Sequence, residues 1–169
     1  MLWKMLRERS RSRAVRHLGV LGTPAEPGLD RFVAQAASAF AAPISLLTVL
    51  HDQQMLVKAS TGLDMECLPR KDGFCHYAVD QDDLLEVCDA LADPFFRTLP
   101  CVTSEPHVRY YLGAPLTLTH DIDIGMLCVV DTVARPPASR DQRSYLIGLA
   151  RQAADAIERR ADFRNGLAA

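Results

Sequence analysis

Cysteine is the residue type through which this sequence could do the most chemistry, and it occurs five times. A thiolate can attack an electrophilic sulfur or oxygen atom, and a second thiol can then close a disulfide. The number is odd, no CxxC pair occurs and no export signal precedes them, so we expect reduced thiols in the cytoplasm. Zinc sites need ligand pairs at close spacing, so the pattern predicts no metal site. The positions are Cys67, Cys75, Cys88, Cys101 and Cys128.

Aromatic and histidine side chains form a second group of candidates, which could supply polar tips on the apolar walls of a pocket. Cys75 and His76 are adjacent on a predicted helix and point about 100° apart, so they form no catalytic dyad by themselves. Tyr110 and Tyr111 are adjacent on a predicted strand, so one of them must face away from the pocket. The candidate ligand-binding residues are Phe74, Cys75, His76, His107, Tyr110 and Tyr111.

Length and composition limit what surrounds these side chains. The 169 residues suffice for one domain with its own core, and 49% are hydrophobic and 24% charged. These proportions exclude a disordered chain, a collagen-like repeat and a coiled-coil rod. No apolar run reaches the ~18–20 residues of a spanning helix, so we expect no transmembrane segment. A net charge of −2 argues against a dedicated nucleic-acid binder.

Positive charge is concentrated near the N-terminus. The segment 1–17 holds six basic residues and one acidic residue, Glu8. A basic helix tip that carries Trp3 could contact an anionic membrane surface, although the pattern is more typical of a solvated or partner-packed helix end. We therefore treat 1–17 as a basic helical segment ahead of the domain.

Helical patterns open the chain. A first helix is predicted over 2–20, and a second begins at Thr23, where Pro24 and Glu26 complete a capping box. Apolar residues at helical spacing continue this second helix to Phe40.

A long helix closes the chain. Ser139 and Gln142 form a capping box that opens a helix to about residue 163, with 164–169 as a tail. We expect a single domain over 18–163.

The middle of the chain is rich in strand patterns, with a short helix over 73–80 capped by Asp72 and an irregular loop over 89–106. Hairpin spacing between neighbouring strands indicates an antiparallel sheet covered mainly on one side by helices, an α+β domain. The predicted strands span 44–50, 54–60, 84–88, 109–118 and 122–131.

Several motifs in this order resemble bacterial GAF domains, over about 18–160. They are Leu18-Gly19-Val20-Leu21-Gly22-Thr23-Pro24, Pro43-Ile44-Ser45-Leu46-Leu47-Thr48-Val49, Gly73-Phe74-Cys75-His76-Tyr77-Ala78, Asp89-Ala90-Leu91-Ala92-Asp93-Pro94, Tyr111-Leu112-Gly113-Ala114-Pro115-Leu116 and Ile124-Gly125-Met126-Leu127-Cys128-Val129-Val130-Asp131. The resemblance implies a PAS-related fold with a central antiparallel sheet of five to six strands. Terminal helices would pack on one face, and a ligand pocket would lie on the other.

The resemblance also implies a function: a small-molecule sensor in bacterial signal transduction, commonly a homodimer through its terminal helices. The alanines of the last helix, including Ala150 and Ala153, suit close packing against a second copy or against the domain's own sheet. No kinase or cyclase segment follows Ala169, so we expect the output to pass through a separate protein.

Specialised members of the family bind bilins or cyclic nucleotides. In bilin-binding GAF domains a cysteine directly precedes a histidine after the long loop, and Pro106 takes that place before His107 here. Covalent bilin is therefore not expected. The spaced Asn-Lys-Phe-Asp-Glu motif of the cyclic-nucleotide binders is not traceable, which leaves a cyclic nucleotide open but without support. No cofactor is predicted, and a small-molecule ligand stays unidentified.

A catalytic alternative is free methionine-(R)-sulfoxide reductase, which is a standalone GAF protein. By this resemblance Cys101 would attack the sulfoxide sulfur, and Cys75 or Cys67 would resolve the sulfenic acid as a disulfide. The reductase's flanking residues are not reproduced around Cys101, and the spacing from Cys101 to Gly113-Ala114-Pro115 is too long. Because free cysteine is among the most buried residue types, the simpler interpretation is three core thiols. A third alternative is a ligand-free interaction module whose own side chains fill the pocket.

Overall fold

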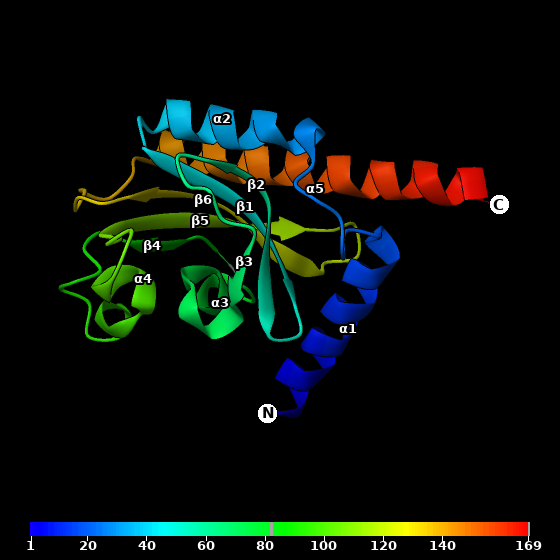
Figure 1. The fold of residues 1–169 in the computed structure, drawn as a ribbon, viewed down its shortest axis with the longest axis horizontal. Coiled ribbons are helices and arrows are strands. Elements are labelled where there is room, and N and C mark those ends of the chain that lie inside the picture. Colours follow the sequence, from blue (N-terminus) through cyan, green and yellow to red (C-terminus); the bar gives the residue numbers. More distant parts are fainter. Residues whose placement is uncertain (82, 169) are drawn as a thin grey trace.

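Alternating and continuous apolar runs build one six-stranded sheet in this computed structural model, which describes residues 1–81 and 83–168. Three 3₁₀ turns accompany the helices and strands (Figure 1). The elements are α1 (Leu2–Leu18), α2 (Asp30–Ala39), β1 (Ile44–His51), β2 (Gln54–Thr61), β3 (Cys67–Pro69), α3 (Phe74–Ala78), β4 (Leu85–Val87), α4 (Pro100–Thr103), β5 (Tyr110–Thr117), β6 (Asp123–Asp131) and α5 (Arg140–Ala168), with 3₁₀ turns at Pro27–Leu29, Arg70–Asp72 and Phe96–Thr98.

The sheet has the strand order β3-β2-β1-β6-β5-β4, and all neighbouring pairs are antiparallel. β1 and β6 lie in the centre and are buried on both faces, which explains their nearly continuous apolar sequences. The register places Cys128 of β6 between Leu46 of β1 and Gly113 of β5. On the face that carries Cys128, the β6 thiol therefore lies between a β1 side chain and the bare backbone of β5.

Helices cover the two faces of the sheet unequally (Figure 1). α2 and α5 lie along one face and enclose the larger core, while α3 and α4 lie on the other face over a second, smaller core. The predicted α+β architecture with its antiparallel sheet is confirmed.

α1 lies across the end of the sheet and joins the two layers. Val15 and Leu18 enter the core beneath α2 and α5. Towards the N-terminus, Arg11 is only 1% exposed, donates to the Asp123 carbonyl at 2.6 Å and pairs with Asp80 just beyond α3. The basic segment is thus docked on the domain through a buried guanidinium group.

A second arginine ties α1 to the turn before α3. Arg70 is buried and donates from both terminal nitrogens to the carboxylate of Glu8, at 2.6 and 2.9 Å. Burial raises the pKa of Glu8, but the hydrogen bond from Arg70 and the charges of Arg11 and Arg70 outweigh it and lower that pKa overall. Glu8 is therefore held ionised between two guanidinium groups.

The predicted start of the second helix is wrong. Thr23 caps nothing: its hydroxyl donates to the Val20 carbonyl at 2.9 Å and accepts from the buried ammonium of Lys58 at 2.8 Å. Pro27 disfavours helical backbone at Glu26, which is extended with φ −101° and ψ 113°. α2 consequently begins at Asp30, after a 3₁₀ turn.

The last helix begins as predicted and ends later. The Ser139 amide donates to Gln142 Oε1 at 2.9 Å, and the Gln142 amide donates to Ser139 Oγ at 3.1 Å, so the capping box is confirmed. α5 continues through the predicted tail to Ala168, and Ala169 lies outside the described residues.

The region around α3 also differs in detail from the prediction. Asp72 belongs to a 3₁₀ turn, and Gly73 is the residue that precedes α3. The loop 89–106 contains a 3₁₀ turn and α4, whose four residues were too few to give a helical period. The three-residue strand β3 was missed for the same reason. Among the described helices, none combines the length and the apolar character that a membrane crossing requires.

Candidate functional site

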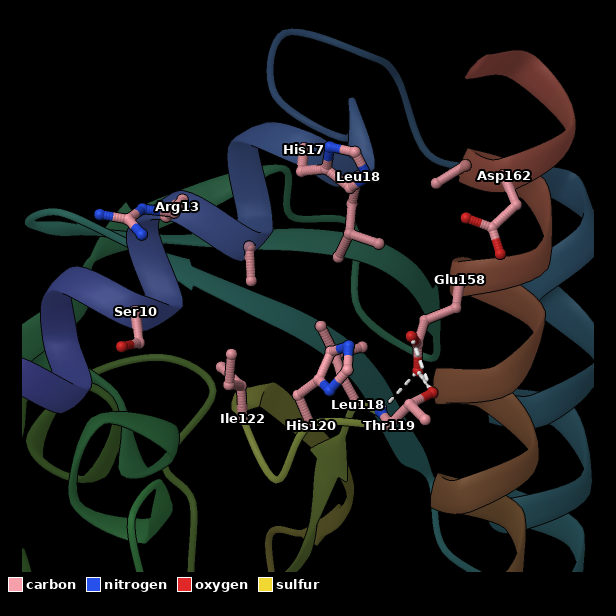
Figure 2. Close-up of a pocket in the computed structure, with 12 residues that line it drawn as sticks. Ser10, Arg13, His17, Leu18, Leu118, Thr119, His120, Ile122, Glu158 and Asp162 are labelled. Atoms are coloured by element: carbon pink, nitrogen blue, oxygen red, sulfur yellow. Dashed lines mark hydrogen bonds between the residues drawn. The ribbon is translucent and has the colours of Figure 1, made fainter. Parts of the chain in front are cut away.

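Two hollows compete as the candidate site. A wide groove of about 570 Å³ lies between α1, the β5–β6 turn and α5 (Figure 2). A small cavity of about 50 Å³ lies between the sheet and α3. The two differ in lining as well as size, so each is described in turn.

The groove has an apolar floor and polar walls. Figure 2 shows Arg13 and His17 on α1, His120 on the turn, and Glu158 and Asp162 on α5. The Glu158 carboxylate is engaged already, because it accepts hydrogen bonds from the Thr119 amide and hydroxyl at 2.8 and 2.9 Å. Arg13, His17, His120 and Asp162 are exposed, so water competes for every charge in the groove.

The cavity is almost wholly apolar and is formed by residues far apart in the sequence. Its inner wall comes from the central strands, and its outer wall comes from β2, β3, α3 and α4. Among the described residues that line it, none carries a formal charge at neutral pH apart from what its thiols can acquire. The lining comprises Ile44, Leu46, Met55, Leu63, Met65, Leu68, Gly73, Phe74, Cys75, Cys101, Pro106, Val108, Tyr111, Cys128 and Val130.

A phenol and two thiols supply the polar atoms in the depth of this cavity. The Tyr111 hydroxyl lies 3.4 Å from the Sγ atom of Cys75, and both side chains are 2% exposed. Tyr111 lies over Gly113, since a Cβ atom at Gly113 would lie 2.3 Å from the Tyr111 hydroxyl oxygen. Cys128 is directly across the β5–β6 ladder from Gly113. The absence of a side chain at Gly113 therefore brings Tyr111, Cys75 and Cys128 together.

The two buried thiols differ in acidity. A hydrogen bond from Cys128, with further ones from Thr48 and Tyr111, lowers the pKa of Cys75 to about 7 despite burial. The same contact with Cys75 raises the pKa of Cys128 well above its usual value. Burial likewise raises the pKa of Tyr111. Cys75 is thus the group that loses its proton first, and its neighbours remain hydrogen-bond donors.

Aromatic rings close the cavity on one side. Phe74 is stacked between Phe96 and Tyr111, with centroids 4.9 Å apart on each side and interplanar angles of 18° and 11°. Such stacking fixes the ring of Tyr111 and therefore the direction of its hydroxyl. The stack also occupies space that a large planar ligand would need.

The predicted ligand-binding residues are only partly brought together. Phe74, Cys75 and Tyr111 line the cavity. His76 lies outside it, where its Nδ1 accepts from Arg70 Nε at 2.9 Å, and burial together with the Arg70 charge lowers its pKa. His107 is exposed, 3.6 Å from the carboxylate of Glu105.

Tyr110 is on the opposite face of the sheet from Tyr111. It belongs to the core beneath α5, where its hydroxyl donates to Glu86 Oε1 at 2.9 Å. Burial and the neighbouring Glu86 carboxylate raise its pKa. Strand alternation required one tyrosine to face away, and the register makes it Tyr110.

Of the three cysteines of the reductase alternative, Cys75 and Cys101 line the cavity and Cys67 does not. Cys101 lines the cavity beside Cys75, but burial raises the pKa of its thiol to about 11, which disfavours a nucleophilic thiolate. Its Sγ donates to the Asp72 carbonyl at 3.6 Å. Cys67 is exposed on the edge strand β3 and does not line the cavity. Among the thiols of the cavity, Cys128 is the one whose side chain is hydrogen-bonded to Cys75.

Cys128 is the site residue that sequence reasoning missed. It lies in a strand that is apolar on both faces, so the sequence pattern did not indicate which face of the sheet the Cys128 side chain is on. Gly113 within a strand was the available clue, because a glycine there marks a close approach of another group. In the part of the chain that the structure describes, no group of three His, Cys, Asp or Glu side chains is arranged to hold a metal ion.

Comparison with known proteins agrees with the fold. A family model described as "GAF domain" matches residues 25–157. A Pseudomonas aeruginosa protein named as a cyclic di-GMP phosphodiesterase is 42% identical over 135 residues, which cover 79% of this chain and 23% of that protein. The chain therefore spans less than a quarter of this curated relative.

Solved structures give the same fold at low identity. The GAF domain of a Coxiella burnetii phosphoenolpyruvate-protein phosphotransferase has a TM-score of 0.67 at 18% identity, with 96% of each chain covered. The corresponding Acinetobacter domain has a TM-score of 0.66 at 19% identity and covers 95% of this chain and 98% of its own. The Thermosynechococcus elongatus PixJ GAF domain has a TM-score of 0.62 at 14% identity, with 83% of this chain and 88% of that chain covered. The chain belongs to the GAF domain family.

Proposed function

We propose that this GAF domain is a regulatory sensor, and that its cavity under α3 binds a small uncharged molecule. The observation that carries the proposal is the apolar cavity with polar atoms of Cys75, Cys128 and Tyr111 in its lining. An apolar site with a few placed polar groups is the usual form of a small-molecule site. The P. aeruginosa relative, which is named for cyclic di-GMP hydrolysis, supports a role in signalling.

The size of the cavity limits the ligand. Sites for drug-sized molecules and cofactors have volumes of roughly 300–1,000 Å³, whereas this cavity has about 50 Å³. Its lining also offers no cationic side chain to a phosphate, among the residues described. We therefore propose neither a nucleotide nor a bilin, and we assign a regulatory rather than a catalytic role to this domain.

The output would pass through α1. Arg70 follows β3 and precedes α3, and it holds Glu8, while Asp80 follows α3 and holds Arg11. A ligand that moves α3 therefore moves both ion-pair partners of α1. Since packed elements respond by discrete shifts, a small displacement at the cavity suffices to change how α1 is docked.

We further propose a cytoplasmic homodimer that acts on a separate output protein, with 18–163 as the single domain and 1–17 as its docked helix. The inner alanines of α5, such as Ala150 and Ala153, are fully buried in the domain's own core and are not free for a partner. Exposed apolar residues remain on the terminal helices. They are Leu2, Trp3, Met5, Leu6, Phe163 and Leu167.

Xenon is a suitable probe, because it is apolar, uncharged and small enough for such a cavity. We expect xenon to shift the methyl NMR signals of Met55 and Met65 and to change amide exchange in α1. Leu68→Trp, at the partly exposed rim, should block both effects, whereas Leu56→Trp on β2 outside the cavity should not. Unchanged methyl signals in the folded wild type would contradict a ligand cavity.

A further inference from the structure

Resting on the proposed function, we propose that the ligand class is a hydroperoxide such as hydrogen peroxide, which oxidises Cys75 and Cys128 to a disulfide. The cavity would then be a site of thiol modification, and the bond would connect α3 directly to β6.

The first argument is the placement of the two thiols. Both line the same cavity, and the hydroxyl of Tyr111 lies 3.4 Å from the Cys75 sulfur and over Gly113. Cys128 is the cross-strand neighbour of that glycine. One sulfur comes from a short helix and the other from a central strand, so a bond between them joins elements that are 53 positions apart in the sequence.

The second argument is size and charge. A water molecule needs roughly 10–15 Å³ of such volume, so about 50 Å³ admits a molecule of a few heavy atoms and excludes a sugar, base or tetrapyrrole. An uncharged solute enters an apolar cavity at less cost than an ion. Half-buried residues form the rim and give the route inward: Leu63, Met65, Leu68, Cys101 and Pro106.

The third argument is the chemistry of the surroundings. Peroxide oxidation needs a thiolate, and Cys75 is the more acidic thiol of the pair, with a pKa of about 7. The hydroxyl of Tyr111 keeps its proton because burial raises its pKa, so it stays available as a donor. That donor can stabilise the negative charge on sulfur and then the oxygen that leaves the peroxide.

The reaction has two balanced steps. The Cys75 thiolate attacks one peroxide oxygen, an S–O bond forms, the O–O bond breaks, and the departing hydroxide takes a proton to become water. The Cys128 sulfur then attacks the Cys75 sulfenic acid, an S–S bond forms, and the S–O bond breaks. The hydroxyl group leaves with the Cys128 proton as a second water. Two electrons pass from the thiols to the peroxide, and no other reactant is needed.

The test treats the folded, reduced wild type with a small excess of hydrogen peroxide. Remaining thiols are alkylated after unfolding, and the peptides are mapped by mass spectrometry. We expect a Cys75–Cys128 linked peptide, and its loss on treatment with a dithiol. In Cys128→Ser we expect dimedone to capture a sulfenic acid at Cys75. In Cys75→Ser we expect Cys128 to remain reduced at the same dose.

A matched control is a variant with Cys67→Ser, Cys88→Ser and Cys101→Ser, which leaves only the proposed pair. It should form the same linked peptide as the wild type. Because the wild-type map needs no substitution, the test stands even if a cavity variant folds poorly. Oxidation of the exposed Cys67 while Cys75 and Cys128 stay reduced overturns the proposal, and a Cys75–Cys101 link in the wild type overturns the pairing.

The outcome also separates this inference from the proposed function. Xenon shifts in the methyl spectrum together with two reduced thiols overturn the hydroperoxide and leave a cavity for another small molecule. Absence of both xenon shifts and thiol oxidation overturns the ligand cavity and with it this inference.

Discussion

The groove between α1 and α5 is far larger than the cavity under α3, about 570 against about 50 Å³, yet the smaller space has the more specific lining. Solvent reaches Arg13, His17 and His120, so water and salt weaken any contact that these side chains make with a ligand. In the cavity, packing on all sides holds Cys75, Tyr111 and their donors in one geometry. If the proposed function holds, the difference means that buried polar atoms with defined partners, rather than volume, mark the binding site of this domain.

The largest effect that would test this contrast is Phe74→Ala. Phe74 is 4% exposed and stacked on two rings, so its truncation should lower the free energy of unfolding by about 4 kcal/mol. Phe163→Ala, which removes an aromatic ring that is 69% exposed, is the matched control and should change it by under about 0.5 kcal/mol. Urea denaturation measures the free energy of unfolding of both variants. Similar losses in the two variants would mean that the cavity wall is not tightly packed.

Gly113→Ala should have the next largest effect. The new Cβ atom must displace the Tyr111 hydroxyl, at a cost of about 2 kcal/mol for overpacking. Loss of that donor should raise the pKa of Cys75 from about 7, so alkylation of Cys75 should require higher pH than in the wild type. The pH profile of alkylation, read by peptide mass, checks the shift.

Gly148→Ala on α5 is the control for that substitution. Beyond the adjoining helix backbone, no described residue lies within 4 Å of a Cβ atom at Gly148. Alanine should therefore stabilise the helix by about 0.5–1 kcal/mol and leave the Cys75 profile unchanged. A shifted Cys75 profile in Gly148→Ala, or an unshifted profile in Gly113→Ala, would contradict the link between Gly113 and the thiol site.

Glu8→Gln tests the ion pairs that hold α1, the helix that forms one wall of the groove. The folded-state pKa of Glu8 lies below its usual value of 4.5, so the carboxylate stabilises the fold above that value and ceases to do so as pH falls through the folded pKa. We expect Glu8→Gln to be slightly less stable than wild type at neutral pH, by under about 1 kcal/mol for this partly exposed group. The free energies of unfolding of the variant and the wild type should converge in acid.

Hydrogen exchange of α1 between neutral and acid pH measures this effect segment by segment. Asp162→Asn on the exposed part of α5 serves as the control and should leave α1 exchange unchanged. A constant difference between Glu8→Gln and wild type across the whole pH range would contradict the ionised Glu8 between Arg11 and Arg70.

The smallest effect is expected in the groove itself. His120→Ala and Arg13→Ala remove exposed side chains from its walls, so each should change the free energy of unfolding by under about 0.5 kcal/mol. Neither should alter the alkylation profile of Cys75. A loss above about 1 kcal/mol in either variant would show that the groove is a preorganised site after all.

Much of the fold could be predicted from the sequence because its signals are local. Hairpin spacing predicted the antiparallel strands, and the Ser139–Gln142 box predicted the start of α5, since both depend on neighbours in the chain. Thr23 failed as a cap because Lys58, 35 residues away, engages its hydroxyl. A distant partner of this kind leaves no mark on the local pattern.

The sequence by itself determined the composition of the site: which segments are apolar, that Phe74 and Cys75 begin a short helix, and that Tyr110 and Tyr111 face opposite ways. Only the tertiary structure decided that Tyr111 faces the cavity, that Cys128 joins Cys75 there, and that Cys67 and His107 do not. The physical reason is register. Periodicity gives each strand two faces, but hydrogen bonding between strands far apart in the chain decides which residues share a face and meet across Gly113.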